Sequence, residues 1–177
     1  MDQENGVTEE LTRALAAAGA TVRFDQRPGD IGAIIRLHGL LYAAEHGYSL
    51  DFEGYVAKTF AGYAWPPSKR ERLWLVEKAG DLRGCIAIMK AAETTAQLRW
   101  LLLLSDLRGC GLGRALVGDA LAFCRENGYS VVTLWTEGSL SIATTLYRRF
   151  GFVKVETKTS RIWGKERTEE RYDLQLA

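Results

Sequence analysis

The stretch from Arg108 to Arg114 carries the residue types that bind phosphate. Three glycines alternate within five positions, two arginines flank them and a leucine run precedes them, so that the segment reads Leu101-Leu102-Leu103-Leu104-Ser105-Asp106-Leu107-Arg108-Gly109-Cys110-Gly111-Leu112-Gly113-Arg114. The free N–H groups of a helix N-terminus bind anions. Glycine lets a backbone approach a phosphate closely because it has no Cβ. The segment therefore predicts a site for a phosphate-bearing cofactor.

Two common phosphate-binding motifs are excluded. A Rossmann fingerprint would need glycine at position 114 or 116, where the chain has Arg114 and Leu116. The Gly-Lys-Ser/Thr ending of a P-loop is also missing from the sequence. The remaining alternative is a glycine-rich turn without a ligand. Three glycines so close together cost chain entropy unless the backbone itself has a task, which favours a ligand.

The hydrophobic periodicity predicts the elements that must position this turn. Helices are expected over 8–18, 31–45, 51–63 (stopped by Pro66-Pro67), from the glycines to Asn127-Gly128, and over 141–150. Strands are expected over 21–25, 73–77, 82–90, 95–104, 131–135, 152–162 and 171–176. This order predicts an α/β (mixed α+β) fold, with a central mixed sheet and helices on both faces.

Four details of this prediction concern single elements. We expect Asp30 to cap the second helix and Gly84 to mark a bulge or a close approach. The leucine-rich strand 95–104 is expected to be buried on both faces. The polar segment 164–170 is expected to be a loop between the last two strands.

Size and composition restrict the class of protein. A chain of 177 residues fits one domain, and a formal net charge of +1 gives no reason to expect nucleic acid or an acidic membrane as a partner. The three cysteines indicate neither a disulfide framework nor a zinc site, so no metal and a reducing compartment are expected. The polar start and the short apolar runs indicate no signal peptide and no membrane span, so we expect a cytoplasmic protein.

The turn 108–113 resembles the pyrophosphate-binding motif Arg/Gln-x-x-Gly-x-Gly/Ala of the GCN5-related N-acetyltransferase (GNAT) superfamily. Residues 143–152, Ala-Thr-Thr-Leu-Tyr-Arg-Arg-Phe-Gly-Phe, are similar to the second signature of that family. The resemblance covers about residues 21–177 and implies a mostly antiparallel twisted sheet of about seven strands, splayed between the fourth and fifth strands. Residues 1–20 are then an extension that we expect to be helical.

A closer resemblance is to the acetyltransferase domains fused to MarR-type regulators. It rests on Pro28-Gly29-Asp30-Ile31-Gly32, on the segment 38–48 and on Leu134-Trp135-Thr136. The residues before Pro28 are too few to form a winged-helix domain, so this chain is expected to be a stand-alone or separated module.

The resemblance implies transfer of an acetyl group from acetyl-coenzyme A to a primary amine, by direct attack in a ternary complex. It implies that backbone amides of the turn hold the pyrophosphate, with the helix dipole and the two arginines assisting. The pantetheine arm would pair with the strand edge, where the amide of Leu103 is the expected donor to the thioester carbonyl. The implied cofactor-binding residues are Leu101, Leu102, Leu103, Arg108, Gly109, Cys110, Gly111, Leu112, Gly113, Arg114, Ser141 and Tyr147.

Tyr147 stands at the general-acid position of the family, where a phenol gives a proton to the leaving thiolate. The alternative is a helix tyrosine with a buried ring and a solvated hydroxyl. The sequence departs from the family at Leu140, where many members carry an asparagine that contacts the pantetheine arm. Ser139 or Ser141 is the candidate replacement.

The base and the acceptor site are left open by the sequence. Candidate bases are Glu45, His46, Glu53 and Gln97, the last by orienting a water, and each has the alternative of an ordinary surface role. Trp135 is a candidate wall of the acceptor pocket. The expected acceptor is a small-molecule or peptide amine, and a homodimer is expected from the family. The competing function is a non-catalytic acyl-coenzyme A sensor or regulatory module.

Overall fold

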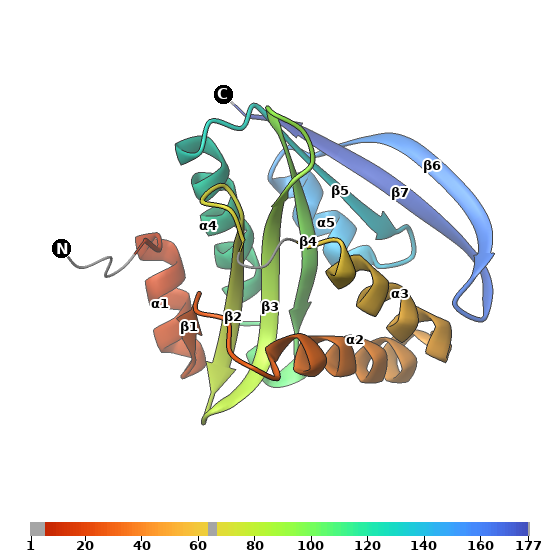
Figure 1. Ribbon diagram of the computed structural model, residues 1–177, viewed down its shortest axis with the longest axis horizontal. Helices are drawn as coiled ribbons and strands as arrows, with labels where there is room; N and C mark the ends of the chain where they lie inside the picture. Colours follow the sequence, from red (N-terminus) through yellow and green to blue (C-terminus); the bar gives the residue numbers. More distant parts are fainter. Residues whose placement is uncertain (1–5, 64–66, 177) are drawn as a thin grey trace.

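A seven-stranded mixed sheet forms the centre of the molecule (Figure 1). The computed structural model describes residues 6–63 and 67–176. The strand order across the sheet is β1-β2-β3-β4-β5-β7-β6, and every neighbouring pair is antiparallel except β4 with β5. The strands are β1 (Thr21–Arg23), β2 (Arg72–Lys78), β3 (Asp81–Lys90), β4 (Thr95–Leu103), β5 (Val131–Glu137), β6 (Val153–Ile162) and β7 (Lys165–Gln175).

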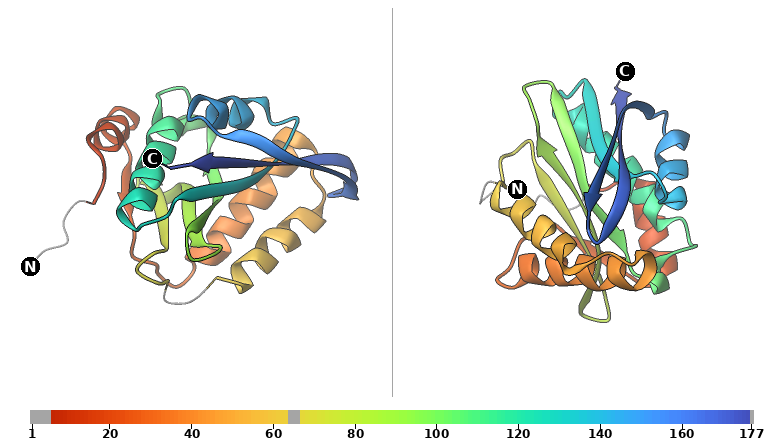
Figure 2. Two further views of the ribbon diagram at one scale, coloured as in Figure 1. Left: turned by 90° about the horizontal axis from the view of Figure 1, so that it is seen from above. Right: turned by 90° about the vertical axis from the view of Figure 1, so that its right-hand side faces the viewer.

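Helices cover both faces of this sheet (Figure 2). One face carries α1 (Glu9–Ala18), α4 (Leu112–Glu126) and α5 (Ser141–Arg149), and the other carries α2 (Asp30–His46) and α3 (Leu50–Ala61). A short 3₁₀ helix, η1 (Ser105–Leu107), follows β4. Among residues 6–63 and 67–176, no helix combines the length and the apolar character needed to cross a bilayer.

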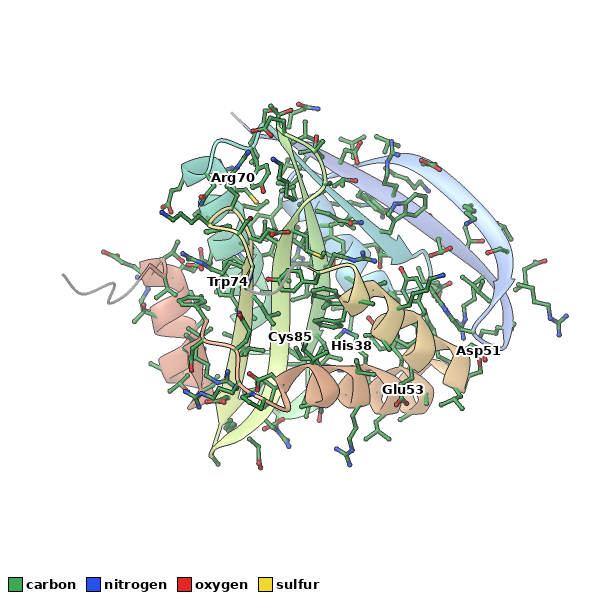
Figure 3. All side chains as sticks on the ribbon, in the orientation of Figure 1. His38, Asp51, Glu53, Arg70, Trp74 and Cys85 are labelled. Carbon is green, nitrogen blue, oxygen red and sulfur yellow. The ribbon has the colours of Figure 1, made fainter. Side chains whose placement is uncertain are left out.

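Each face of the sheet has its own hydrophobic core because side chains alternate along a strand. Trp74 of β2 packs with α1 and α4, whereas its neighbours Leu73 and Leu75 pack with α2 and α3. Cys85 of β3 lies on the α2–α3 side (Figure 3). Strands β2 and β3 therefore contribute side chains to both cores.

Most local signals are confirmed. The side chain of Thr8 caps α1 by accepting a hydrogen bond from Leu11 N, Gly47 ends α2 in a left-handed conformation, and Gly128 does the same after α4. Gly84 lies at a register shift between β2 and β3, and a Cβ on it would lie 2.5 Å from Leu103 Cδ2 and 2.8 Å from Leu102 O. The expected close approach is therefore real, and it is made to β4.

The start of α2 differs from the expectation. The N-cap of α2 is Gly29, so the prediction that Asp30 caps this helix is wrong. The Asp30 carboxylate instead accepts hydrogen bonds from the guanidinium of Arg23 and from Arg27 N. Helix α3 ends at Ala61; the expected stop signal includes Pro66, which lies outside the described residues.

Two expectations about strands are wrong. Strand β4 is not buried on both faces: its burial alternates, and every second residue from Thr95 to Leu103 is only half-buried. The segment 164–170 is not a loop, because β7 begins at Lys165 after a two-residue turn. Trp163 and Gly164 both have positive φ in that turn, as tight hairpin turns require. A hydrophobic pattern could not predict this hairpin because its cross-strand pairs are formed by polar residues.

Candidate active site

Strands β4 and β5 separate part of the way along their length. They pair only at Thr95–Val131, Ala96–Val132 and Gln97–Thr133. Beyond Gln97, β4 stays with β3 and β5 stays with β7. The gap between them leaves one edge of β4 without a strand partner, because sheet pairing requires strands about 4.8 Å apart. The expected splay is present.

A bulge in β4 sets where the gap begins. Trp100 has φ of 52°, and the β3–β4 register shifts by one residue between Cys85 and Ala87. The indole ring of Trp100 stacks on Phe60 of α3 at 3.7 Å, and its Nε1 donates to Thr59 Oγ1. A positive φ is costly for a bulky residue. Contacts with α3 hold Trp100 in this conformation, which redirects β4 away from β5.

The backbone of β4 past the bulge turns amides into the gap. Leu104 N donates to Arg83 O at 2.9 Å, so this amide points toward β3. Successive amides along a strand point in opposite directions, so the amides of Leu103 and Leu101 point away from β3. The gap is therefore lined by hydrogen-bonding groups that an extended ligand arm can pair with.

The glycine-rich turn follows directly and opens α4. Gly109 and Gly111 have φ of 78° and 83°, a conformation that glycine adopts without strain. Within the described chain, the amides of residues 109–111 donate to no other backbone group, and those at the start of α4 have no partner inside the helix. A run of free amides at the positive end of a fifteen-residue helix fits a diphosphate.

The two arginines of the turn differ in their contacts and exposure. Arg108 Nη1 lies 2.9 Å from Glu45 Oε2, and its Nε donates to Leu103 O at 2.7 Å. Arg114 is mostly exposed, with Nε 3.5 Å from Glu10 Oε1. Cys110 is exposed, and its thiol contacts Leu107 O. Arg108, a predicted cofactor-binding residue, is therefore paired with Glu45, a candidate base.

Tyr147 of α5 is buried, with 6% of its surface exposed. Among the described residues its hydroxyl has no hydrogen-bond partner, and its ring packs edge-on against Phe152. Burial raises the pKa of the Tyr147 phenol well above its usual range, and the nearby Tyr42 hydroxyl adds to the rise. At neutral pH the phenol is protonated and free to donate.

Aromatic rings line the α2–α3 side of the gap. Tyr42 contacts His38, His46, Tyr48 and Phe52 at centroid distances of 6.0, 5.4, 5.1 and 4.6 Å. Burial raises the pKa of Tyr42 to about 12. His38 is fully enclosed, with Nδ1 2.9 Å from Ile34 O, and burial lowers its pKa to about 4. These residues form an apolar wall with few charges of its own.

The remaining predicted residues occupy different places. His46 Nε2 lies 3.9 Å from Glu45 Oε2, and Gln97 is half-buried at the last β4–β5 pair. Trp135 is half-buried in β5 opposite Arg171. Glu53 packs on α2, since a Cβ on Gly39 would lie 2.5 Å from Glu53 Oε2 (Figure 3). Glu45, His46 and Arg108 are thus brought together, whereas Glu53 faces the helix interface.

The two serines proposed in place of the missing asparagine also differ. Ser139 Oγ donates to a carboxylate oxygen of Glu137. Ser141 is exposed at the start of α5, and its carbonyl accepts from Thr144 Oγ1. Only Ser141 keeps its hydroxyl unengaged among the described residues.

The sequence reasoning missed four residues beside the gap: Tyr48, Glu137, Arg167 and Glu169. Glu137 was missed because the strand was expected to end at Trp135, whereas β5 runs on to Glu137. Arg167 and Glu169 lay in the segment expected to be a loop. The alternation Thr133, Trp135, Glu137 was the signal that could have placed Glu137 on the α2–α3 face.

The opened strand pair and the amide-lined turn at its end define a protein that binds an extended, phosphate-bearing arm. Residues 41–152 match the family model described as the Acetyltransferase (GNAT) family. Because this match covers more than half of the sequence, the chain belongs to the GNAT family.

Relatives of known name share part of this region. N-acetyltransferase family 8 member 2 of Rattus norvegicus is 35% identical over 86 residues, which cover 46% of this chain and 38% of the relative. The chain thus matches well under half the length of that curated protein.

Solved structures match the fold over nearly the whole chain. An acetyltransferase from Streptococcus agalactiae has a TM-score of 0.69 at 16% identity, covering 89% of this chain and 99% of that one. A Salmonella typhimurium protein solved with its cofactor acetyl-CoA has a TM-score of 0.66 at 18% identity, covering 90% and 95%. At these identities the likeness establishes the shared fold.

Proposed function

We propose that this protein transfers an acetyl group from acetyl-coenzyme A to the nitrogen of a primary amine, by direct attack in a ternary complex. The observation that carries the proposal is the free edge of β4 beside a turn of unpaired amides. A diphosphate fits the turn, and an extended amide-containing arm fits the edge. Membership of the GNAT family, and a relative named an N-acetyltransferase, support the same reaction.

The turn and the edge divide the binding of acetyl-coenzyme A between them. The amides of residues 109–114 and the dipole of α4 hold the pyrophosphate. The amides of Leu101 and Leu103 are turned into the gap, where they pair with the pantetheine arm as a neighbouring strand would. The amide nearest the thioester carbonyl also stabilises the charge that develops on its oxygen during attack.

Tyr147 is the proposed general acid. When the amine nitrogen attacks the thioester carbon, the carbon–sulfur bond breaks and the coenzyme leaves as a thiolate. The phenol of Tyr147 gives its proton to that sulfur. Its raised pKa means that the phenol is protonated at neutral pH, so a proton is available when the thiolate forms.

The alternative function is a sensor that binds acyl-coenzyme A without turnover. Such a sensor needs the same turn and the same gap, so binding does not separate the two functions. The free phenol of Tyr147 has a task only in the enzyme. We therefore favour the enzyme.

Turnover tests the proposal. Purified protein is given acetyl-coenzyme A with polyamines, amino acids, aminoglycosides and peptides in turn, and release of the free thiol is followed together with the mass of the acetylated product. Acceptor-dependent thiol release with a matching product is expected. Tight binding of acetyl-coenzyme A with no acceptor giving turnover would favour the sensor, and absence of binding would overturn both.

We also propose that the protein acts in the cytoplasm, in keeping with free thiols at Cys85, Cys110 and Cys124. A module related to those fused to MarR-type regulators, acting as a homodimer, is our proposal for its context. Size-exclusion chromatography with light scattering tests the dimer.

A further inference from the structure

Two carboxylates face each other beside the mouth of the gap. Glu137 is the last residue of β5, and Glu169 on β7 is its register partner. Both lie on the α2–α3 face, because Leu134 and Tyr172, at the alternate positions of β5 and β7, pack into the core on the α1–α4–α5 side. Alternate residues of the two strands point the other way. Like charges at directly opposite positions destabilise an antiparallel pair.

Neither carboxylate has a cationic partner among the described residues. Glu137 is only 8% exposed, and within the described chain its side chain accepts one hydrogen bond, from Ser139 Oγ. Arg167, two residues before Glu169, forms no ion pair with either carboxylate: its Nη2 donates to the carbonyls of His46 and Gly47, its guanidinium lies 3.7 Å from the Tyr48 ring centroid, and its Nε is buried without a partner in the described chain. A buried carboxylate without a counter-charge is costly, so this place favours a cation.

The hydroxyl of Tyr48 is an independent sign of a ligand here. Tyr48 is 5% exposed, and its hydroxyl is buried with no hydrogen-bond partner in the described part of the chain. The ring of Tyr48 packs on the guanidinium of Arg167, whose side chain lies on the same face of β7 as Glu169, the residue opposite Glu137. Burial raises the pKa of the Tyr48 phenol above its usual range; the charge of Glu137 adds to the rise, and that of Arg167 opposes it. The Tyr48 ring therefore lies beside the two carboxylates, and its hydroxyl oxygen is free to accept.

The position of Glu137 along the sheet places this group next to the reaction. Gln97 and Thr133 form the last β4–β5 pair, and the two strands are parallel. Glu137 lies four residues further along β5; because the bulge at Trp100 adds one residue to β4, Glu137 is at about the level of Leu102 on the opposite side of the gap. Leu102 lies between Leu101 and Leu103 on the edge of β4 to which we assign the thioester arm.

We infer that Glu137, Glu169 and the Tyr48 hydroxyl form a site for a protonated alkylamine group of the acceptor. An alkylammonium has three N–H donors, and this site offers two carboxylates and one phenolic oxygen as acceptors. Charge-assisted hydrogen bonds of this kind are stronger than neutral ones. The site selects cationic acceptors over zwitterionic ones. This selectivity in turnover rests on the proposed function, whereas the binding of a cationic amine to the site does not.

An acceptor series of constant chain length tests the selectivity. Putrescine, butylamine and γ-aminobutyrate have the same number of backbone carbons and carry two, one and no net positive charges at neutral pH. With acetyl-coenzyme A saturating, we expect kcat/KM to fall in that order. Glu137→Gln and Glu169→Gln should each raise the KM for putrescine about tenfold, while the Kd for acetyl-coenzyme A stays within about twofold.

Glu166→Gln is the matched control, since Glu166 is an exposed glutamate on the same strand. Its KM for putrescine should be that of the unmodified protein. Tyr48→Phe keeps the ring that Arg167 packs on and removes only the hydroxyl, so it should raise the KM with little change in Tm. Because Glu137→Gln relieves repulsion between facing charges, its Tm should be unchanged or higher. An unchanged KM in both glutamine variants, or γ-aminobutyrate as the best substrate, would overturn the inference.

Binding without turnover separates this inference from the proposed function. Calorimetry of putrescine with the protein saturated in coenzyme A should give a measurable Kd that weakens about tenfold in Glu137→Gln. If putrescine binds in this way but no amine is ever acetylated, the inferred cation site is supported and the proposed enzymatic function is contradicted. If other amines are acetylated while putrescine shows no binding that depends on Glu137, the enzyme stands and the site is wrong.

Discussion

Arg108 and Glu45 form an ion pair, with Nη1 and Oε2 2.9 Å apart, that connects the glycine-rich turn after β4 to the last turn of α2. The same end of α2 is held from the other side by Arg167, which donates to the carbonyls of His46 and Gly47. The glycine-rich turn and the β6–β7 hairpin therefore meet at one helix end.

Glu45→Gln should tighten the binding of acetyl-coenzyme A about threefold. Both side chains are about one-third exposed, so the pair itself contributes little to stability. Removing the carboxylate takes a negative charge away from the diphosphate site and frees the guanidinium. Arg108→Gln should weaken binding, and calorimetry with the single and double variants measures the coupling. Weaker binding by Glu45→Gln would mean that the pair positions Arg108 for the ligand.

Tyr147→Phe should lower kcat about a hundredfold and leave the Kd for acetyl-coenzyme A nearly unchanged. The substitution removes only the hydroxyl, which has no partner in the described chain, so packing against Phe152 is kept. Steady-state kinetics with a competent acceptor, together with calorimetry, separates the two effects. Phe152→Leu is a useful control for packing, since it should lower Tm more than it lowers kcat. An unchanged kcat in Tyr147→Phe would remove this residue from the mechanism.

Gly84→Ala should destabilise the protein by about 1–3 kcal/mol, the cost of overpacking a tight interior. The added Cβ would lie 2.8 Å from Leu102 O, a backbone atom that cannot move aside without shifting β4. Affinity for acetyl-coenzyme A should fall as well, because β4 carries the edge that receives the ligand. Urea unfolding and calorimetry measure the two quantities.

Gly32→Ala is the matched control for this substitution. Gly32 lies in α2, and a Cβ added to it would have nothing within 4 Å. Alanine favours helix over glycine by up to about 1 kcal/mol, so this variant should be equally or more stable. A loss of stability as large as that of Gly84→Ala would show that the close approach to β4 is not the cause.

The free energy of unfolding should fall as the pH drops from about 6.5 toward about 4, because of His38. Burial lowers its pKa to about 4, whereas the unfolded chain takes up the proton near the ordinary value of about 6.5. The folded state thus favours the neutral ring of His38. The contribution of this neutral ring to stability is complete above the pKa of the unfolded chain and is lost as the pH falls through the pKa of the folded state. The total is about 3 kcal/mol.

Urea unfolding between neutral pH and pH 4.5 or so measures this slope. His38→Phe, which fills the buried space with an uncharged ring, should flatten the profile in that range. His46→Gln is the control, because His46 is the other histidine of the chain and is not enclosed. An equal flattening by His46→Gln, or none by His38→Phe, would contradict this prediction.

Local chemistry explains what could be read from the sequence alone. Helix ends follow from capping residues such as Thr8 and Gly47, and the turn at residues 108–113 follows from glycines whose positive φ needs no distant partner. The order of helices and strands follows from hydrophobic period. These signals depend on a few neighbouring residues, so they can be recognised without knowing the tertiary structure.

Long-range contacts decided the rest. The ring of Trp100, at the bulge in β4, stacks on a ring of α3, and β4 loses its pairing with β5 beyond Gln97. Glu137 and Glu169 face each other only because of the register in which β5 pairs with β7. A residue's own neighbours in sequence carry no information about such a partner. The sequence alone thus determined the fold class and the glycine-rich turn, and only the tertiary structure placed Glu137 opposite Glu169.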